Sequence, residues 1–237
     1  MISEFPFIIL LIFIHLFYIN NKGLQEIGRL DYPLGIVCGG SGNGLCKSIL
    51  FESNQPYGEV ESVYSILKGI LQKLDCQLVS GDGMDDVMSF LCLSFGVISN
   101  IDLDSEGLRW MGETRFTLWG VYEMLRNQTY PAKVWIKPAS SLQDMTVTDE
   151  MLELPPLDVP LSHEEGWRCL EDSYSFVWVL VTSHSSSSVY SAPTLTLTDG
   201  EMMVVLLKDE GRMTMTEVLL GLDNGDHVNN DKVSTFG

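Results

Sequence analysis

The chain has 237 residues, of which 45% are hydrophobic, enough for a packed core in one large or two small domains. Fourteen basic against 32 acidic residues give a net charge of −18, which repels phosphate backbones and disfavours adsorption to anionic headgroups. The composition therefore excludes a disordered chain and argues against nucleic acid as a partner, and any membrane contact needs an apolar or local basic patch.

An apolar run, FPFIILLIFIHLFYI, occupies residues 5–19. It is shorter than the roughly 20 residues of a membrane-spanning helix, and it lacks the basic flank and cleavage site of a signal peptide. Three interpretations remain for residues 1–22: a short membrane anchor, a signal segment, or a stretch outside the mature fold. The third is favoured.

A strand, a glycine-rich turn and helices are predicted next. LGIVC at 34–38 predicts a strand, GGSGNG follows it, and LCKSILFE begins a helix. Residues 61–73 repeat apolar side chains at helical spacing and predict a second helix.

Strands dominate the remainder. The nearly all-apolar stretch at 87–98 is typical of a strand buried on both faces or of a strand pair. Residues 140–172 are acidic and contain proline, which indicates a loop or insertion. The other expected elements are a helix at 112–127, strands at 133–136, 176–183 and within 192–208, and a helix at 215–222, after which the tail shows no closing element.

The cysteines and histidines favour neither disulfides nor a metal site. Five scattered cysteines without a CxxC pair indicate reduced thiols in a cytoplasmic protein. The four histidines lack the i, i+4 spacing of a helical metal site, so no metal ligands are predicted.

The glycine-rich turn has the composition of a phosphate site. Gly40 and Gly42 let the backbone approach a phosphate, Ser41 and Asn43 can donate hydrogen bonds, and the following helix N-terminus adds partial positive charge. The turn matches neither the P-loop nor GxGxxG, and glycine turns are common in α/β proteins. A plain structural turn therefore remains the alternative.

A charged cluster, IDLDSEGLRWMGETRF at 101–116, follows the apolar stretch. One interpretation is a solvated loop and helix start with surface ion pairs. The other is a polar site at the mouth of an apolar pocket, where guanidinium groups hold phosphate oxygens and a carboxylate holds an ammonium group.

Both motifs resemble one family. GGSGNGLCKSI is similar to the GSGN segment of the diacylglycerol kinase superfamily of lipid kinases, and SFLCLSFGVISNIDLDSEGLRWMGETRFTL resembles the sphingosine kinases in particular. APTLTLTDGEMMVVLLK is similar to the family's Ala-Pro, Asp-Gly and following strand. The resemblance runs from about Pro33 to Leu222 and identifies the chain as a truncated member.

The resemblance implies phosphate transfer from ATP, with Mg²⁺, to the primary hydroxyl of a sphingoid base drawn from a membrane surface. A ceramide or diacylglycerol kinase-like enzyme is a lesser alternative. The implied site residues are Gly40, Ser41, Gly42, Asn43, Arg109 and Arg115 for ATP, and Asp102 for the lipid headgroup. The implied fold is an α/β nucleotide-domain remnant over residues 23–73, followed by an antiparallel β-sandwich lipid domain over 74–237, α+β overall.

The sequence departs from the family at the general base. The family carries that base on a Ser-Gly-Asp-Gly loop ahead of GSGN, and here SGDG occurs only after it, at 80–83. Asp82 is therefore predicted to be a lookalike in a tight turn, and no catalytic residue is assigned. Asp199-Gly200-Glu201 likewise has the spacing of an earlier Asp-Gly turn.

These departures predict that the chain alone lacks kinase activity. The alternative function is a noncatalytic fragment that binds lipid or a partner. A third alternative is a membrane-anchored lipid-binding protein that uses residues 5–19.

Overall fold

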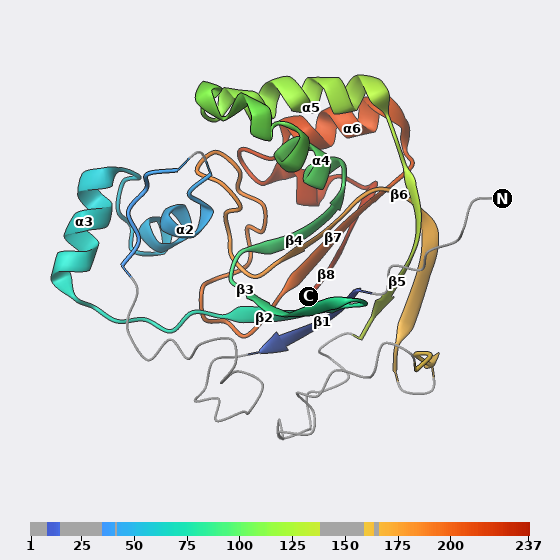
Figure 1. Cartoon of the computed structure of the whole chain (residues 1–237), viewed down its shortest axis with the longest axis horizontal. Coiled ribbons are helices and arrows are strands. Elements are labelled where there is room, and N and C mark those ends of the chain that lie inside the picture. Colours follow the sequence, from blue (N-terminus) through green and yellow to red (C-terminus); the bar gives the residue numbers. More distant parts are fainter. Residues whose placement is uncertain (1–8, 15–34, 41, 138–158, 164–165) are drawn as a thin grey trace.

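The computed structural model describes residues 9–14, 35–40, 42–137, 159–163 and 166–237 (Figure 1). Its strands are β1 (Ile9–Ile14), β2 (Cys76–Gly81), β3 (Met84–Ser89), β4 (Cys92–Gly96), β5 (Tyr130–Ile136), β6 (Arg168–Leu180), β7 (Met203–Lys208) and β8 (Val233–Phe236). Its helices are α2 (Gly44–Glu52), α3 (Glu59–Lys68), α4 (Val97–Asp104), η1 (Glu106–Met111), α5 (Thr114–Arg126), α6 (Gly211–Leu220) and η5 (Asp226–Asn229).

A five-stranded antiparallel sheet is built around β6. This strand pairs with β4, β5 and β7, and β7 in turn pairs with β8. Successive side chains of a strand point to opposite faces, so the apolar runs 176–180 of β6 and 203–207 of β7 bury both faces of the sheet. Phe176, Trp178 and Leu180 enter one core cluster, whereas Tyr174 and Val179 enter the other.

Helices cover one of these faces. Val97 at the start of α4 and Met215 and Val218 of α6 are buried in the same cluster as Phe176. α4, α5 and α6 gather on one side of the sheet, and α2 and α3 lie beyond its end, beside the segment that joins β6 to β7 (Figure 1).

A second, three-stranded sheet has the order β1, β2, β3, with both pairings antiparallel. The strands β2 and β3 form a hairpin whose turn includes Gly83 at a φ of 73°, which confirms the tight turn predicted around SGDG. Part of the apolar run at 5–19 is strand β1, and the rest lies outside the described residues. Within the described residues, no helix has the length and apolar character needed to cross a bilayer.

The helices lie where they are predicted, although α3 ends at Lys68 and not at residue 73. Three other expectations need correction. The described residues 35–38 of the strand predicted at 34–38 pair with no described segment; Ile36 and Cys38 instead pack on α2. In the region 192–208, residues 192–202 form turns and irregular chain, and only β7 is extended. The tail does close the fold, since β8 pairs with β7.

The observed class is α+β, with helices and antiparallel sheets, as predicted. The sandwich arrangement and the domain division at residue 73 stay predictions. The acidic stretch at 140–158 lies outside the described residues, and β6 begins at Arg168 within the region predicted to be a loop.

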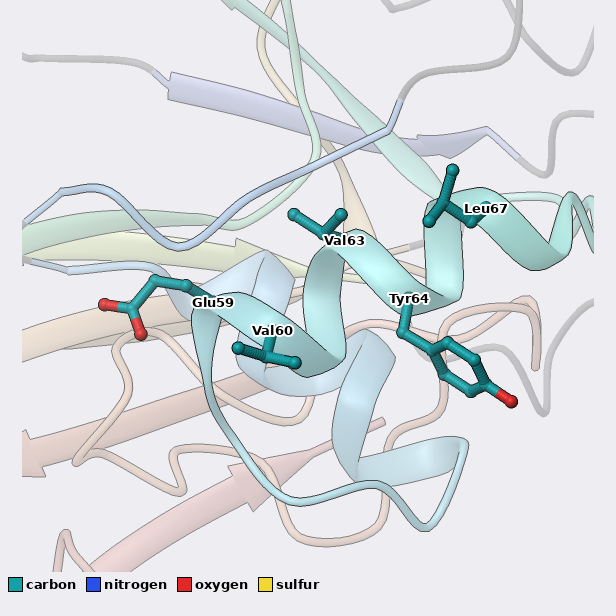
Figure 2. Close-up of a pocket in the computed structure, with 5 residues that line it drawn as sticks. All are labelled: Glu59, Val60, Val63, Tyr64 and Leu67. Carbon is teal, nitrogen blue, oxygen red and sulfur yellow. The ribbon is translucent and has the colours of Figure 1, made fainter.

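One helix leaves an apolar face exposed. Figure 2 shows the side chains of Glu59, Val60, Val63, Tyr64 and Leu67 along α3, where they line a shallow depression. Val60 and Leu67 are 76% and 79% exposed. All five residues belong to a single helix, so among the described residues no other element contributes to the lining of this surface.

Candidate functional site

The glycine-rich turn is closed by one of its own side chains. The N–H of Gly40 donates to Asn43 Oδ1 at 2.9 Å, and Asn43 Nδ2 donates to the Gly40 carbonyl at 2.7 Å. Asn43 takes the left-handed conformation, with a φ of 58°, immediately before α2. Asn suits this position because its short amide tolerates positive φ and bonds locally. Ser41 lies outside the described residues.

The closest backbone approach in this region is at Gly44. A Cβ there would lie 2.5 Å from the carbonyl oxygen of Ser185 and 2.7 Å from that of His184. In contrast, the space beside Gly39 and Gly42 is open. Gly44 is thus required by packing, whereas the open side of the turn leaves room for a ligand.

We call residues 183–188 the serine segment. Its backbone packs against the glycine-rich turn. The Ser187 N–H donates to the Gly42 carbonyl at 2.6 Å, and Asn43 forms a β-bridge with Ser186. Ser48 Oγ on α2 accepts from the His184 N–H at 3.1 Å. These contacts fix the turn and the first turns of α2 against the chain that leaves β6.

A lysine and a tyrosine border the turn. Lys47 Nζ lies 5.6 Å from the centre of the Tyr57 ring, a cation–π arrangement. Burial raises the pKa of the Tyr57 phenol, and the nearby side chains of Ser187 and Asn43 act in the opposite direction. Lys47 also helps burial to lower the pKa of His184 to about 4, so this imidazole is neutral at physiological pH. Lys47 therefore places one positive charge beside the turn.

The charged cluster at 101–116 is organised by a buried arginine. The Arg115 side chain is 2% exposed, and its guanidinium donates to the Asp102 carbonyl at 3.0 Å, to Ser105 Oγ at 2.6 Å and to Asp102 Oδ1 at 3.1 Å. Glu106 Oε1 lies 3.5 Å away. A buried guanidinium is stable only when it has such hydrogen-bonding and charged partners. The residues of the charged cluster therefore pack around Arg115.

The acids of this cluster are exposed to solvent, and Asp102 is one of them. The Asp102 side chain is 62% exposed although one of its oxygens holds Arg115. Arg109 is 69% exposed and pairs with Glu106 at 2.6 Å. Asp102, Arg109 and Arg115 are thus brought together by Glu106 and Ser105, and a cationic ligand can reach Asp102 from solvent.

One contact joins the turn to the charged cluster. Ser187 Oγ donates to Glu113 Oε1, while the Ser187 backbone holds Gly42. Glu113 precedes α5, which carries Arg115. The two sequence motifs therefore meet through the serine segment.

The remaining sequence candidates lie elsewhere. Asp82 is in the turn between β2 and β3, which lies at the far end of that hairpin from α2 and α3 (Figure 1). Asp199 accepts the N–H groups of Thr196 and Glu201, as expected for an Asp-Gly turn. No group of three or more potential metal ligands gathers in the described part of the chain.

Comparison with known proteins agrees with the motifs. Sphingosine kinase 1 of Arabidopsis thaliana is 26% identical over 211 residues, 84% of this chain and 43% of the relative. Sphingosine kinase 1 of Mus musculus is 25% identical over 219 residues, 85% of this chain and 56% of the relative. The sphingoid long chain base kinase 5 of Saccharomyces cerevisiae is 30% identical over 122 residues, half of this chain and 16% of the relative.

The chain is sphingosine kinase-like. The predicted resemblance is thereby confirmed, although no protein-family model matches. The sphingosine kinase-like chain spans about half the length of the curated relatives it matches.

A solved structure from Bacillus anthracis str. Sterne, assigned to the diacylglycerol kinases, shares the fold. Its TM-score is 0.51 at 13% identity, over 90% of the sphingosine kinase-like chain and 59% of that structure. At this identity the likeness extends to the fold alone.

Sequence reasoning missed Ser187, Lys47 and Tyr57. The serine segment offered no signal beyond its composition. Lys47 lies within the GGSGNGLCKSI motif but was assigned no role, and Tyr57 belongs to no motif. Glu113 was counted among the acids of the charged cluster, but its partner is 74 positions away and was not predictable.

Proposed function

We propose that the chain is the lipid-binding part, with a portion of the nucleotide site, of a lipid kinase that acts on sphingoid bases. In this proposal phosphate moves from MgATP to the primary hydroxyl of the base, giving the sphingoid 1-phosphate. Relatives named sphingosine kinases support the lipid kinase class, and the choice of a sphingoid base rests on one carboxylate.

The observation that carries the proposal is the exposed Asp102 carboxylate anchored by buried Arg115. The anchor fixes the direction of the carboxylate, and solvent exposure leaves it open to a ligand. A sphingoid base has a protonated amine near its hydroxyl, and an anion at fixed position attracts such a group. Ceramide and diacylglycerol carry no such positive charge.

The residues of the glycine-rich turn fit a nucleotide phosphate. Open space beside Gly39 and Gly42, the α2 N-terminus and partly buried Lys47 together offer room and positive charge. The resemblance assigns Gly40, Ser41, Gly42, Asn43 and Arg109 to this part of the site. Bound MgATP supplies the phosphoryl group and a metal ion that neutralises charge on the transferring oxygens.

Asp102→Asn tests the assignment. Asparagine keeps an oxygen acceptor for Arg115 but removes the negative charge, so folding should change little while sphingosine binding weakens at least about tenfold. The measurement is titration calorimetry of the full chain with sphingosine in detergent micelles. Urea unfolding of the same samples checks stability.

A short-chain ceramide is the matched control ligand, because its amide carries no charge. Its binding should be equal in the parent chain and the variant. Equal weakening of both lipids, or unchanged sphingosine affinity, would remove Asp102 from the headgroup site.

A noncatalytic lipid- or partner-binding role is the second candidate. Arg109 and Arg115 are both engaged by acids, and Arg115 is almost fully buried. Neither guanidinium is directed to a phosphate in this arrangement, which favours binding without phosphoryl transfer. Sphingosine binding in the absence of any effect of ATP would support this candidate.

A further inference from the structure

We propose that Glu113 and Ser187 are positioning residues that couple the glycine-rich turn to the segment carrying Asp102 and Arg115. Glu113 holds Ser187 by its side chain, and Ser187 holds Gly42 by its backbone. The naming of these two regions as nucleotide and lipid sites rests on the proposed function, but the coupling itself does not.

The first argument is the long-range contact of the Glu113 carboxylate. Glu113 immediately precedes α5, and its side chain makes no cap bond to that helix. Its Oε1 accepts the hydroxyl of Ser187, across 74 positions of sequence. The carboxylate thus serves a tertiary contact.

The second argument is the continuity of contacts beyond Ser187. The N–H of this same residue donates to the Gly42 carbonyl, and neighbouring Ser186 bridges to Asn43. Asn43 in turn closes the turn onto Gly40. A displacement of Ser187 therefore moves the backbone of the glycine-rich turn, which forms the proposed phosphate site.

The third argument is the set of contacts at the Arg115 end. Glu113 lies two residues before Arg115, whose guanidinium donates to Asp102 and Ser105. A change at the Asp102 carboxylate can therefore reach the turn through Arg115, the start of α5, Glu113 and Ser187.

The test is amide hydrogen exchange of the full chain, resolved by NMR at Gly40 and Ser187, whose N–H groups are hydrogen-bonded. Glu113→Ala should speed exchange at both amides about fivefold, the effect of losing one exposed hydrogen bond. Glu113→Gln keeps the oxygen acceptor and should restore exchange to within about twofold. The double variant Glu113→Ala, Ser187→Ala should be no faster than Glu113→Ala alone.

Glu171→Ala is the matched control. Glu171 pairs with Lys133 on the surface of β6 and β5, with a side chain 64% exposed, so its loss should leave Gly40 and Ser187 unchanged. Unchanged exchange in Glu113→Ala, additive effects in the double variant, or a uniform rise over the whole chain would each overturn the coupling.

ATP titration of the same variants separates this inference from the proposed function. A parent chain that binds no ATP but shows the exchange pattern contradicts the nucleotide assignment and leaves the coupling intact. Normal ATP binding with unaltered exchange in Glu113→Ala contradicts the coupling alone.

Discussion

The buried side chain of His184 makes the free energy of unfolding depend on pH. Its ring stacks on Tyr190 at 4.6 Å, meets Phe51 edge-on at 4.9 Å, and shares a hydrogen bond of 2.9 Å with Ser183. Burial first, and then the charge of Lys47, lower its pKa from 6.5 to about 4. The unfolded chain therefore binds the proton at a pH where the folded chain does not.

The sign of the effect follows from that difference. A lowered histidine pKa contributes stability that is complete above pH 6.5 and is lost as the pH falls towards 4. As the pH falls from 7.5 to 5.5, protonation of His184 in the unfolded chain should lower the free energy of unfolding by about 1 kcal/mol. His184→Phe keeps the ring contacts and removes the titration, so the variant should lose less stability over this interval.

Urea unfolding at several pH values checks this prediction. Burial also lowers the pKa of His227, which acts in the same direction, whereas the raised pKa of Glu52 acts in the opposite one. Both contributions are shared by the parent chain and His184→Phe, so the difference between them isolates His184. Parallel curves for the two proteins would contradict the assignment.

At the scale of elements, the junction between β4 and α4 depends on a single glycine. Gly96 has a φ of 79°, and a Cβ there would lie 2.4 Å from the Ser175 carbonyl oxygen. Both the backbone conformation and the space exclude a side chain. Gly96→Ala should lower the unfolding free energy by about 2–4 kcal/mol.

Gly120→Ala is the control for that substitution. Gly120 lies within α5 with normal helical backbone, and the nearest atom to a Cβ is Ile101 Cδ1 at 3.8 Å. Alanine should therefore stabilise the helix by up to about 1 kcal/mol. Equal effects of the two substitutions in thermal unfolding would refute this account of the junction.

Elements with local determinants were predictable from sequence. α2, α3, α5 and α6 follow from helical periodicity, since the pattern and the hydrogen bonds both lie within one segment. Strands depend on partners elsewhere in the chain, so residues 35–39 look like a strand but pair with no described segment. Conversely, Val233–Phe236 is short and polar in part, yet forms β8 because β7 presents an open edge.

The same distinction applies to the candidate site. Asp102, Arg109 and Arg115 are close in sequence, and their clustering follows from spacing. The partners of Arg115 were not predictable, because burial of a guanidinium depends on the packing of α4 against α5. The Ser187 contacts join segments far apart in the chain, which sequence pattern alone cannot indicate.

For the whole molecule, the central prediction concerns activity. The chain spans about half the length of the curated sphingosine kinases that it matches, and Asp82, whose sequence matches the family's base loop, lies in a hairpin turn away from α2. We expect the purified 237-residue chain to transfer little or no phosphate to sphingosine. A radiolabelled ATP assay with extraction of lipid product measures this.

Asp82→Asn is the matched variant for that assay. Any residual activity should be the same in this variant as in the parent, because Asp82 is predicted to have no catalytic role. Robust activity that disappears in Asp82→Asn would identify it as the base and overturn its assignment as a turn residue.

The pairing of β5 with β6 bears on how far the connection between these two strands can vary in length. Seven residue pairs, from Tyr130 with Tyr174 to Ile136 with Arg168, hold the two strands in fixed register on either side of a long connection. The entropy lost in closing a flexible loop grows only logarithmically, about 0.6 kcal/mol for each doubling of length. The ladder therefore holds the sheet whatever the length of the chain between the two strands, so residues added between β5 and β6 should leave their register unchanged.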